Sequence, residues 1–351
     1  MITSVEFDGP GLPLRFVERA FPKIGTGEAL VRVSLCTLCG SDLHTYFGRR
    51  TTPLPTVLGH EIVGEIVETH GASDLAGTPL QLGDRVVWSV ACSCRHCFYC
   101  EHELPQKCDQ LQKYGHVKVD PARGPSGGLT THCHLLANTA IVRAPDSIPD
   151  AVAAPAMCAT ATVAAALRAG GADPSGTTVI IGAGLLGLTA SAMGGAKNRI
   201  VVDPQPARLA LAKAFGATHA VTPGELADCL RNSSSCRGAD VVLEMSGVST
   251  AVEQALASVR IGGTVVLVGS VFPSRPIPIH ADDLVRRCLT IRGVHNYAPI
   301  DLQTAIEFLS ERVDRFPFSA QVARTFPLAE VAEAFAFAET EKPIRVGITP
   351  W

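Results

Sequence analysis

The sequence predicts an α/β protein in two parts, a β-rich unit and a doubly wound parallel sheet. Its length of 351 residues exceeds what one hydrophobic core usually organises. Up to about residue 145, short β segments such as "ALVRVSLC" and "EIVGEIVE" are separated by Gly and Pro. From about residue 160, apolar strands alternate with amphipathic helices, which is typical of βαβ units.

The strands and helices of the second part can be followed along the chain. "TTVIIGAG" leads into a helix, "RIVVDP" precedes "QPARLALAKAFGA", "ADVVLEMSG" precedes "STAVEQALASV", and "GGTVVLVG" is a further strand. After about residue 290 the pattern is mixed, with "DLQTAIEFLSERV" as a helix and "PIRVGITPW" as a closing strand. We therefore expect a parallel-sheet domain over residues 156–292. The β-rich domain is expected over residues 1–155, completed by 293–351.

Composition excludes several functional classes. The net charge is −3 and no long basic run occurs, which argues against nucleic-acid and membrane-surface partners. The first residues, "MITSVEFDGPGLPLRF", lack the charged start and apolar core of a signal peptide. The alanine-rich segment 151–167 predicts a buried helix rather than a membrane span. A cytoplasmic protein is expected.

The twelve cysteines indicate metal binding, since five of them fall in "CSCRHCFYCEHELPQKC". In a reducing compartment, clustered cysteines are more often metal ligands than disulfides. Cys94, Cys97, Cys100 and Cys108 are separated by two, two and seven residues. Four thiolates can close a tetrahedral zinc site with no open position, which predicts a structural zinc. Cys92 is the alternative to Cys94, although the regular spacing favours Cys94.

A glycine-rich turn predicts a dinucleotide site. Gly182, Gly184 and Gly187 form the pattern G-x-G-x-x-G between a strand and a helix. Such glycines permit a tight turn, close approach of a pyrophosphate, and close packing of helix on strand. Leu185 and Leu186 occupy the two variable positions at the start of the helix and are assigned to the same cofactor site.

Asp203 favours NAD over NADP. It ends the next strand, "IVVD", where a carboxylate accepts hydrogen bonds from a ribose 2′-hydroxyl and repels a 2′-phosphate. Arg208 is a possible phosphate ligand, but its position favours a solvated helix face. Only fifteen residues separate Gly187 from Asp203, so the intervening helix is expected to be short and interrupted by Gly194 and Gly195.

A second set of metal-binding residue types is dispersed. Cys39 lies in "CTLCGSDLH", His60 and Glu61 lie in "GHE", and Cys158 lies in "APAMCATAT". Two thiolates and an imidazole leave zinc a fourth position for water or substrate. Composition alone does not pair these residues.

Taken together, these motifs make the chain resemble the zinc-dependent medium-chain alcohol dehydrogenases, which join a GroES-like catalytic domain to a Rossmann domain. The resemblance covers essentially the whole length. It is carried by "CGSDLH", "GHE", the four-cysteine loop, "GAGLLG" with Asp203, and "PIRVG". Within the family, "LPQKCDQLQKYGH" and "APAMCATATVAAAL" are most similar to the clade associated with phosphonate catabolism gene clusters.

The resemblance implies a catalytic zinc in addition to the structural one. It implies that Cys39, His60 and Cys158 are the ligands of the catalytic zinc. Glu61 matches a carboxylate that can approach the metal when water leaves, and Asp42 matches the carboxylate that orients the ligand histidine.

The resemblance also implies a proton relay and a cofactor contact. Ser41 and His44 match residues that pass the alcohol proton through the nicotinamide ribose to the surface, and Arg345 matches an arginine near the cofactor pyrophosphate. The alternatives are that Ser41 caps a helix that starts at Asp42, and that His44 is an exposed loop residue.

Arg50 is the feature that bears on the substrate. The chain aligns with the family without a gap over residues 39–60, which puts Arg50 where simple-alcohol enzymes carry apolar pocket side chains. A guanidinium matches phosphate or phosphonate oxygens in a bidentate fork. We expect Arg50 to bind the anionic group of a small phosphonate alcohol, with Arg49, Lys113 and His116 as further candidates. The alternatives are a solvated arginine or a salt bridge.

The sequence thus favours a zinc- and NAD-dependent dehydrogenase of a hydroxyalkylphosphonate or similar anionic alcohol. A polyol or amino-alcohol dehydrogenase of the sorbitol or threonine type is the nearest alternative. A non-catalytic zinc- and NAD-binding redox sensor is an alternative of another class. The acidic charge balance argues against a nucleic-acid module. Family resemblance implies a homodimer or homotetramer.

Overall fold

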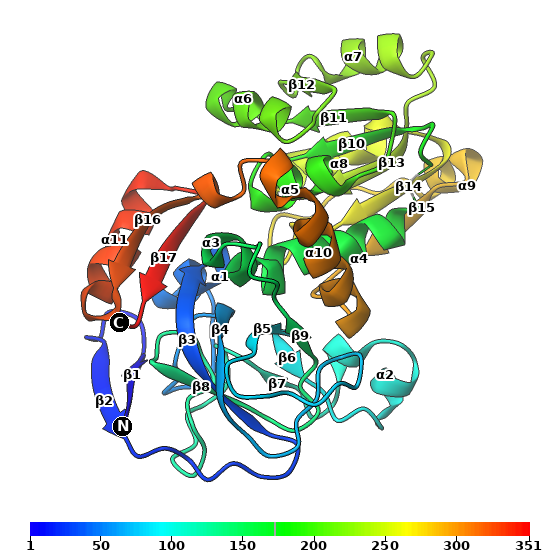
Figure 1. Cartoon of the computed structure of the whole chain (residues 1–351). Helices are drawn as coiled ribbons and strands as arrows, with labels where there is room; N and C mark the ends of the chain where they lie inside the picture. The colour runs from blue at the N-terminus through cyan, green and yellow to red at the C-terminus, as the bar shows by residue number, and fades with distance from the viewer. Residues whose placement is uncertain (172) are drawn as a thin grey trace. The chain divides into compact units, whose positions relative to one another are not determined.

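The computed structural model describes residues 1–171 and 173–351, and the chain divides into two compact units (Figure 1). Unit 1 comprises Met1–Cys158, Ala298–Val313 and Phe318–Trp351, and unit 2 comprises Ala159–Tyr297 and Asp314–Pro317. The expected boundary after residue 155 had put Cys158 in the second domain. Cys158 belongs to unit 1 instead, because its segment packs with the strands that carry the other zinc-ligand candidates.

Unit 1 is built on a mixed, mostly antiparallel sheet. Within the described residues, the strand order is β16-β17-β3-β4-β5-β9, with β8 also paired to β3. The strands are β3 (Ala29–Leu38), β4 (Glu61–Thr69), β5 (Arg85–Trp88), β8 (His132–Leu135), β9 (Ile141–Arg143), β16 (Val322–Pro327) and β17 (Arg345–Thr349). The C-terminal strand β17 lies beside β3, so the last segment of the chain completes the N-terminal sheet.

Smaller elements surround this sheet. Two short hairpins are formed by β1 (Ile2–Glu6) with β2 (Arg15–Arg19) and by β6 (Ala91–Cys92) with β7 (Gln112–Lys113). The helices of unit 1 include α1 (Gly40–Tyr46), α2 (Phe98–Glu101), α3 (Asp150–Pro155), α10 (Pro299–Arg312) and α11 (Val331–Glu341). The sequence pattern had indicated α10 and β17 in this last part of the chain, but not β16 or α11.

The pairing of β3 with β4 positions two of the site residues. These strands are antiparallel, and Thr37 faces Glu61. Cys39 follows Thr37 by two residues, just as β3 gives way to α1, and His60 directly precedes Glu61 at the start of β4. One sheet register therefore brings the "CGSDLH" loop and the "GHE" motif together.

Unit 2 is a Rossmann-type parallel sheet. Its strand order is β12-β11-β10-β13-β14-β15, all parallel within the described residues, which is the doubly wound order 3-2-1-4-5-6. The strands are β10 (Thr177–Ile181), β11 (Asn198–Val202), β12 (His219–Val221), β13 (Ala239–Glu244), β14 (Val259–Leu267) and β15 (Thr290–Gly293). The predicted fold class is confirmed, although the sequence pattern had not indicated β12 or β15.

Helices connect these strands. They are α4 (Ala161–Gly170), α5 (Leu185–Met193), α6 (Pro206–Ala214), α7 (Leu226–Ser233), α8 (Ser249–Ser258) and α9 (Ala281–Arg287). The core includes side chains of β10, β11 and β13, such as Val179, Ile200 and Val242, all completely buried. As expected, α5 is short, but Gly194 is its C-cap in an extended conformation. The Gly194-Gly195 pair therefore ends this helix rather than interrupting it.

The alanine-rich segment is a buried helix, as predicted. Residues Asp150–Gly170 are long and apolar enough to cross a membrane by length and composition, but 72% of the most apolar window is buried inside the protein. The segment consists of α3, a π-helical turn over Ala156–Thr160, and α4. A single span of this kind, mostly buried, is typical of a core helix in a folded domain.

We predict that Gly64→Ala destabilises unit 1. A Cβ at this position in β4 would lie 2.2 Å from the Arg32 carbonyl oxygen and 2.6 Å from Val31 Cγ1, so the β3–β4 pair would have to separate. Overpacking of this kind costs about 3 kcal/mol, and the thermal midpoint should fall by about 6 °C or more. Gly195→Ala is the control, because a Cβ there meets nothing within 4 Å. Equal calorimetric midpoints for both variants would contradict the prediction.

Candidate active site

Unit 1 gathers four metal-binding side chains that are far apart in the sequence. One ligand atom from each of Cys39, His60, Glu61 and Cys158 lies within 4.8 Å of the others. Cys39 is the N-cap of α1, and His60 precedes β4. Cys158 lies in the π-helical turn between α3 and α4, a type of turn that occurs frequently at functional sites. We call these four residues the metal cluster.

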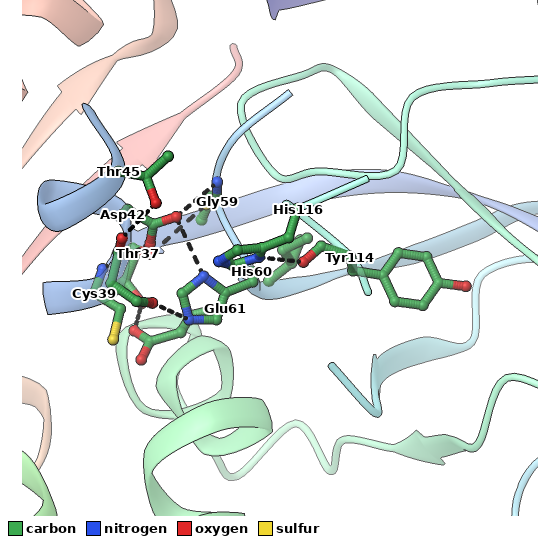
Figure 2. Close-up of polar contacts among 12 residues, drawn as sticks. Thr37, Cys39, Asp42, Thr45, Gly59, His60, Glu61, Tyr114 and His116 are labelled. Atoms are coloured by element: carbon green, nitrogen blue, oxygen red, sulfur yellow. Dashed lines mark hydrogen bonds and ion pairs between the residues drawn. The ribbon is translucent and has the colours of Figure 1, made fainter. Parts of the chain in front are cut away.

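Asp42 links the segments that carry two residues of the metal cluster, Cys39 and His60 (Figure 2). Its carboxylate is completely buried and accepts hydrogen bonds from Cys39 N at 3.0 Å, Gly59 N at 3.1 Å and His60 Nδ1 at 3.2 Å. Burial alone would raise the pKa of Asp42, but His60 holds it below its ordinary value. Because Nδ1 is bound to Asp42, Nε2 of His60 is the nitrogen left to bind a metal.

Ser41 and His44 lie on the same short helix as Asp42. Ser41 Oγ is 3.3 Å from Nε2 of His60, so its hydroxyl is at the metal cluster. Helix α1 begins at Gly40 with Cys39 as its cap, and Ser41 therefore does not cap it. His44 is partly exposed, in the last turn of α1, where burial and then Arg49 lower its pKa.

A buried ion pair borders the metal cluster. Arg345 binds both carboxylate oxygens of Glu61, at 2.7 and 2.8 Å, and its Nη2 is 3.7 Å from Cys39 Sγ. Thr37 donates to the same carboxylate at 2.6 Å. Burial raises the pKa of Glu61 to about 7, although Arg345 opposes the shift. The expected contact of Arg345 with a pyrophosphate stays a prediction, because its guanidinium is engaged with Glu61 within unit 1.

The two thiols of the metal cluster differ: the pKa of Cys39 is lowered, whereas the hydrogen bond to Cys39 and then burial raise the pKa of Cys158 well above its ordinary value. The Cys158 thiol hydrogen-bonds Cys39 and, together with the charge of Arg345, holds the pKa of Cys39 well below that of an ordinary thiol despite burial. The thiolate is the form of cysteine that binds metals. Two cysteines and one histidine are the ligand set of a catalytic zinc with an open position, and the residues therefore fit the metal.

Arg50 has a partner that the sequence did not indicate. Its Nη1 donates to Nε2 of His116 at 3.0 Å, and Nδ1 of His116 donates to the Tyr114 carbonyl oxygen at 3.0 Å. Burial, together with nearby cations, lowers the pKa of His116 to about 3, so the imidazole is neutral. The ring of His116 packs edge-on against that of His60, with centroids 5.0 Å apart (Figure 2).

The four-cysteine loop forms a second group. The Sγ atoms of Cys94, Cys97, Cys100 and Cys108 lie within 4.8 Å of one another, with 3.6 Å between Cys97 and Cys100 and 4.0 Å between Cys94 and Cys100. A tetrahedron of thiolates with zinc–sulfur bonds of 2.3 Å has edges of about 3.8 Å, so this group fits zinc. Cys92 lies outside the group and hydrogen-bonds the Ala137 carbonyl oxygen.

The glycine-rich turn in unit 2 has the geometry of a dinucleotide site. Gly182 has a positive φ of 104°, and Gly184 is the N-cap of α5. A Cβ at Gly187 would lie 1.8 Å from the Gly182 carbonyl oxygen, whereas a Cβ at Gly184 would meet nothing within 4 Å. Gly187 is thus required for packing. The free space over Gly184, at a helix N-terminus, fits a pyrophosphate.

Asp203 is tied to this turn. Its Oδ2 accepts from Ala183 N at 2.8 Å, and its Oδ1 accepts from Gln205 N at 2.9 Å. Arg208 Nη1 lies 3.9 Å from Asp203 Oδ2, so the arginine is beside this carboxylate rather than only on a solvated face. Of the two variable residues of the motif, Leu185 is buried and Leu186 is partly exposed.

Comparisons with known proteins identify the family. Residues 25–146 match the alcohol dehydrogenase GroES-like domain, and residues 182–311 match the zinc-binding dehydrogenase domain. An alcohol dehydrogenase of Geobacillus stearothermophilus is 36% identical over 309 residues, covering 85% of this chain and 86% of the relative. The chain belongs to the zinc-dependent medium-chain alcohol dehydrogenase family. It is therefore a zinc-dependent oxidoreductase of alcohols that uses a nicotinamide dinucleotide.

Further relatives agree with this family. A sorbitol dehydrogenase of Bacillus subtilis is 32% identical over 302 residues, covering 83% of this chain and 81% of the relative. An alcohol dehydrogenase structure from Thermotoga maritima has a TM-score of 0.91 and 28% identity, covering 100% of this chain and 99% of the other. The relatives do not separate the phosphonate-associated clade from the rest of the family.

The sequence did not indicate three contacts of the site, one of which is the Arg50–His116 hydrogen bond described above. Thr37 was not singled out, although its position opposite Glu61 follows once the β3–β4 register is known. The pairing of Arg345 with Glu61 joins residues 284 positions apart, and no local pattern indicates it.

We predict that alanine substitutions at Gly184 and Gly187, two glycines of the same turn, affect different properties. Gly187→Ala should lower the thermal midpoint because its Cβ overlaps the Gly182 carbonyl oxygen. Gly184→Ala should leave that midpoint unchanged, since its φ of −77° suits alanine and its Cβ has free space. It should weaken NADH binding about tenfold or more, because the methyl group occupies the space of the pyrophosphate. Calorimetry and NADH fluorescence titration measure the two effects. Wild-type affinity in Gly184→Ala would show that the cofactor does not approach this backbone.

Proposed function

We propose that this enzyme transfers a hydride between a small alcohol and NAD, with the metal cluster as the catalytic centre and the glycine-rich turn as the cofactor site. The observation that carries the proposal is the convergence of Cys39, His60 and Cys158 in one cluster, with Ser41 Oγ 3.3 Å from the ligand nitrogen of His60. A regulator that only bound zinc and NAD would need no hydroxyl at this position.

Cys39, His60 and Cys158 would hold the catalytic zinc. When bound there, zinc supplies Lewis acidity, which lowers the pKa of an alcohol hydroxyl. Asp42 keeps Nε2 of His60 directed into the metal cluster by binding Nδ1. Arg345 and Thr37 hold the Glu61 carboxylate beside the same ligands.

Ser41 and His44 would move the proton. The Ser41 hydroxyl lies 3.3 Å from the ligand nitrogen of His60, and it would accept the proton that the alcohol loses while it passes its own proton on. His44, one turn further along α1, is partly exposed and its lowered pKa keeps it able to accept that proton at neutral pH. NAD, held at the glycine-rich turn, would supply the acceptor for the hydride of the alcohol carbon.

The remaining parts of the proposal concern zinc number, cofactor and setting. Cys94, Cys97, Cys100 and Cys108 would hold a second, structural zinc, since four thiolates leave no open position. Asp203 favours NAD, and the free cysteines throughout the described chain support a reducing, cytoplasmic setting. A homodimer or homotetramer is proposed from the family alone.

Two substrate classes are compatible with this reaction. Arg50 favours a hydroxyalkylphosphonate or another anionic alcohol. The similarity to a sorbitol dehydrogenase favours a neutral polyol, and a threonine-type amino alcohol is a third member of the same range. These alcohols would be oxidised by the same zinc chemistry. They differ only in the chemical group that lies beyond the reacting hydroxyl.

The reaction is tested by zinc content and turnover. The wild-type protein should contain two zinc ions per chain by mass spectrometry and should form NADH from an alcohol. Cys158→Ser should retain one zinc, keep the wild-type thermal midpoint and lose at least about 100-fold in kcat, because it removes a ligand of the metal cluster. Cys97→Ser should also retain one zinc but lower the midpoint. NAD binding without turnover of any alcohol would favour the redox sensor instead.

Cofactor choice is tested by Asp203→Asn, which removes the charge but keeps an acceptor for Ala183 N. The wild-type kcat/KM should favour NAD over NADP by at least about tenfold, because the carboxylate repels a 2′-phosphate. The variant should lose most of this preference, since Arg208 beside it is then free to bind the phosphate. Adding Arg208→Ala should abolish the gain in NADP use. An unchanged preference in Asp203→Asn would contradict the assignment.

A further inference from the structure

Two cations lie beside the metal cluster without a carboxylate partner. Arg50 makes one side-chain hydrogen bond in the described part of the chain, to Nε2 of His116, and no ion pair. This leaves most of its five N–H donors available. His116 itself is buried, accepts from Arg50 at Nε2, and donates from Nδ1 to the Tyr114 carbonyl oxygen. Its ring packs on the ligand His60. The guanidinium of Arg50 is therefore one imidazole ring away from a metal-ligand candidate.

Lys113 is the second cation. It ends strand β7, three residues before His116, and the two are joined by a turn in which His116 N donates to the Lys113 carbonyl oxygen. Burial and the repulsion of Arg50 lower the pKa of Lys113, and Cys158, Cys39 and Asp42 are the negative groups close enough to oppose this. The turn itself places Lys113 beside His116, which contacts both Arg50 and the ligand His60. Among described residues, no ion pair or side-chain hydrogen bond involves Lys113.

Neighbouring arginines show that this arrangement is unusual in the chain. Arg49, the residue next to Arg50, binds both carboxylate oxygens of Glu339 at 2.9 Å. Arg345, on the other side of the metal cluster, has Glu61. Half-buried cations that repel each other and have no counterion destabilise a fold, so their presence indicates that a ligand supplies the negative charge.

We propose that Arg50 and Lys113 form a subsite for a tetrahedral oxyanion with two negative charges, the phosphonate or phosphate group of a short-chain alcohol that is oxidised at the metal cluster. This inference rests on the proposed function for the site of oxidation. Two cations match a dianion, the free guanidinium donors match paired phosphoryl oxygens, and Lys113 adds a point charge. A carboxylate, with one charge, would leave one cation unneutralised. The single imidazole between Arg50 and His60 requires a short carbon chain.

Binding is the first test, because it does not depend on turnover. Methylphosphonate, titrated calorimetrically into the zinc-loaded protein, should bind the wild type, and acetate should bind at least about tenfold more weakly. Arg50→Ala and Lys113→Met should each weaken methylphosphonate binding by at least about 30-fold, and Arg50→Lys by less. Arg49→Ala is the matched control: it removes the adjacent guanidinium, which is already paired with Glu339, and should bind like the wild type.

Turnover is the second test and identifies the source of the oxyanion. 2-Hydroxyethylphosphonate and glycerol 1-phosphate are compared with the neutral alcohols 1,3-propanediol and glycerol. In Arg50→Ala, KM for the charged substrate should rise at least about 30-fold. The loss in kcat/KM for the neutral alcohols should be at least about tenfold smaller than the loss for the charged substrate. Whichever charged substrate has the higher wild-type kcat/KM assigns the group as phosphonate or phosphate.

The outcomes separate this inference from the proposed function. Turnover of neutral alcohols with no binding of methylphosphonate would overturn the subsite and leave the dehydrogenase intact. Methylphosphonate binding that depends on Arg50 and Lys113, without turnover of any alcohol, would support the subsite and overturn the proposed function. Equal losses on charged and neutral substrates in Arg50→Ala, with unchanged methylphosphonate affinity, would show that Arg50 only supports His116.

Discussion

The buried carboxylate of Asp42 is the interaction on which the catalytic part of this structure depends. It binds the backbone of Cys39 and Gly59 and the imidazole of His60, so it fixes the start of α1 against the segment that leads into β4. A completely buried carboxylate is stable only when such partners satisfy it. The same three contacts that stabilise Asp42 therefore set the backbone positions of two metal ligands and the direction of the ligand nitrogen. The third ligand, Cys158, reaches the cluster through a π-helical turn, which directs a side chain that a regular helix would direct elsewhere.

Much of the site could be predicted from the sequence because its chemistry is concentrated in short motifs. The four-cysteine loop and the glycine-rich turn are local, so spacing alone indicates what they do. The catalytic ligands are different: Cys39, His60 and Cys158 meet only because β3 and β4 pair in the observed register and the helix from Asp150 returns to that sheet. The residue types indicate that zinc ligands are present. From the sequence, only the resemblance to a family indicated that Cys39, His60 and Cys158 form one ligand set.

The parts that sequence reasoning missed are long-range polar pairs. Arg345 binds Glu61 across 284 residues and Arg50 binds His116 across 66, and no hydrophobic period marks either pair. The residue that caps α1 was also difficult to predict from the sequence. Serine is a common N-cap, so Ser41 was a reasonable alternative cap, yet the Asp42 carboxylate accepts from the backbone of Cys39 and moves the cap to that residue. The hydrogen bond between Asp42 and Cys39 therefore determines which residue caps α1. Because Ser41 is not the cap, its hydroxyl lies at the metal cluster.

The charges around the metal cluster argue that its excess of cations serves a ligand. Zinc with two thiolates and a neutral imidazole carries no net charge, Glu61 is neutralised by Arg345, and Asp42 contributes one negative charge, against the two positive charges of Arg50 and Lys113. Arg50 and Lys113 add positive charge that repels a metal ion and weakens its binding. A structural role for Arg50 alone, as a donor to His116, would not explain why Lys113, in the turn that leads to His116, also lacks an ion-pair partner among the described residues. An anionic substrate accounts for both cations, because its charge is supplied only when the alcohol is bound and the unfavourable repulsion is then relieved. The repulsion in the free enzyme would then favour anionic alcohols over neutral ones of the same size.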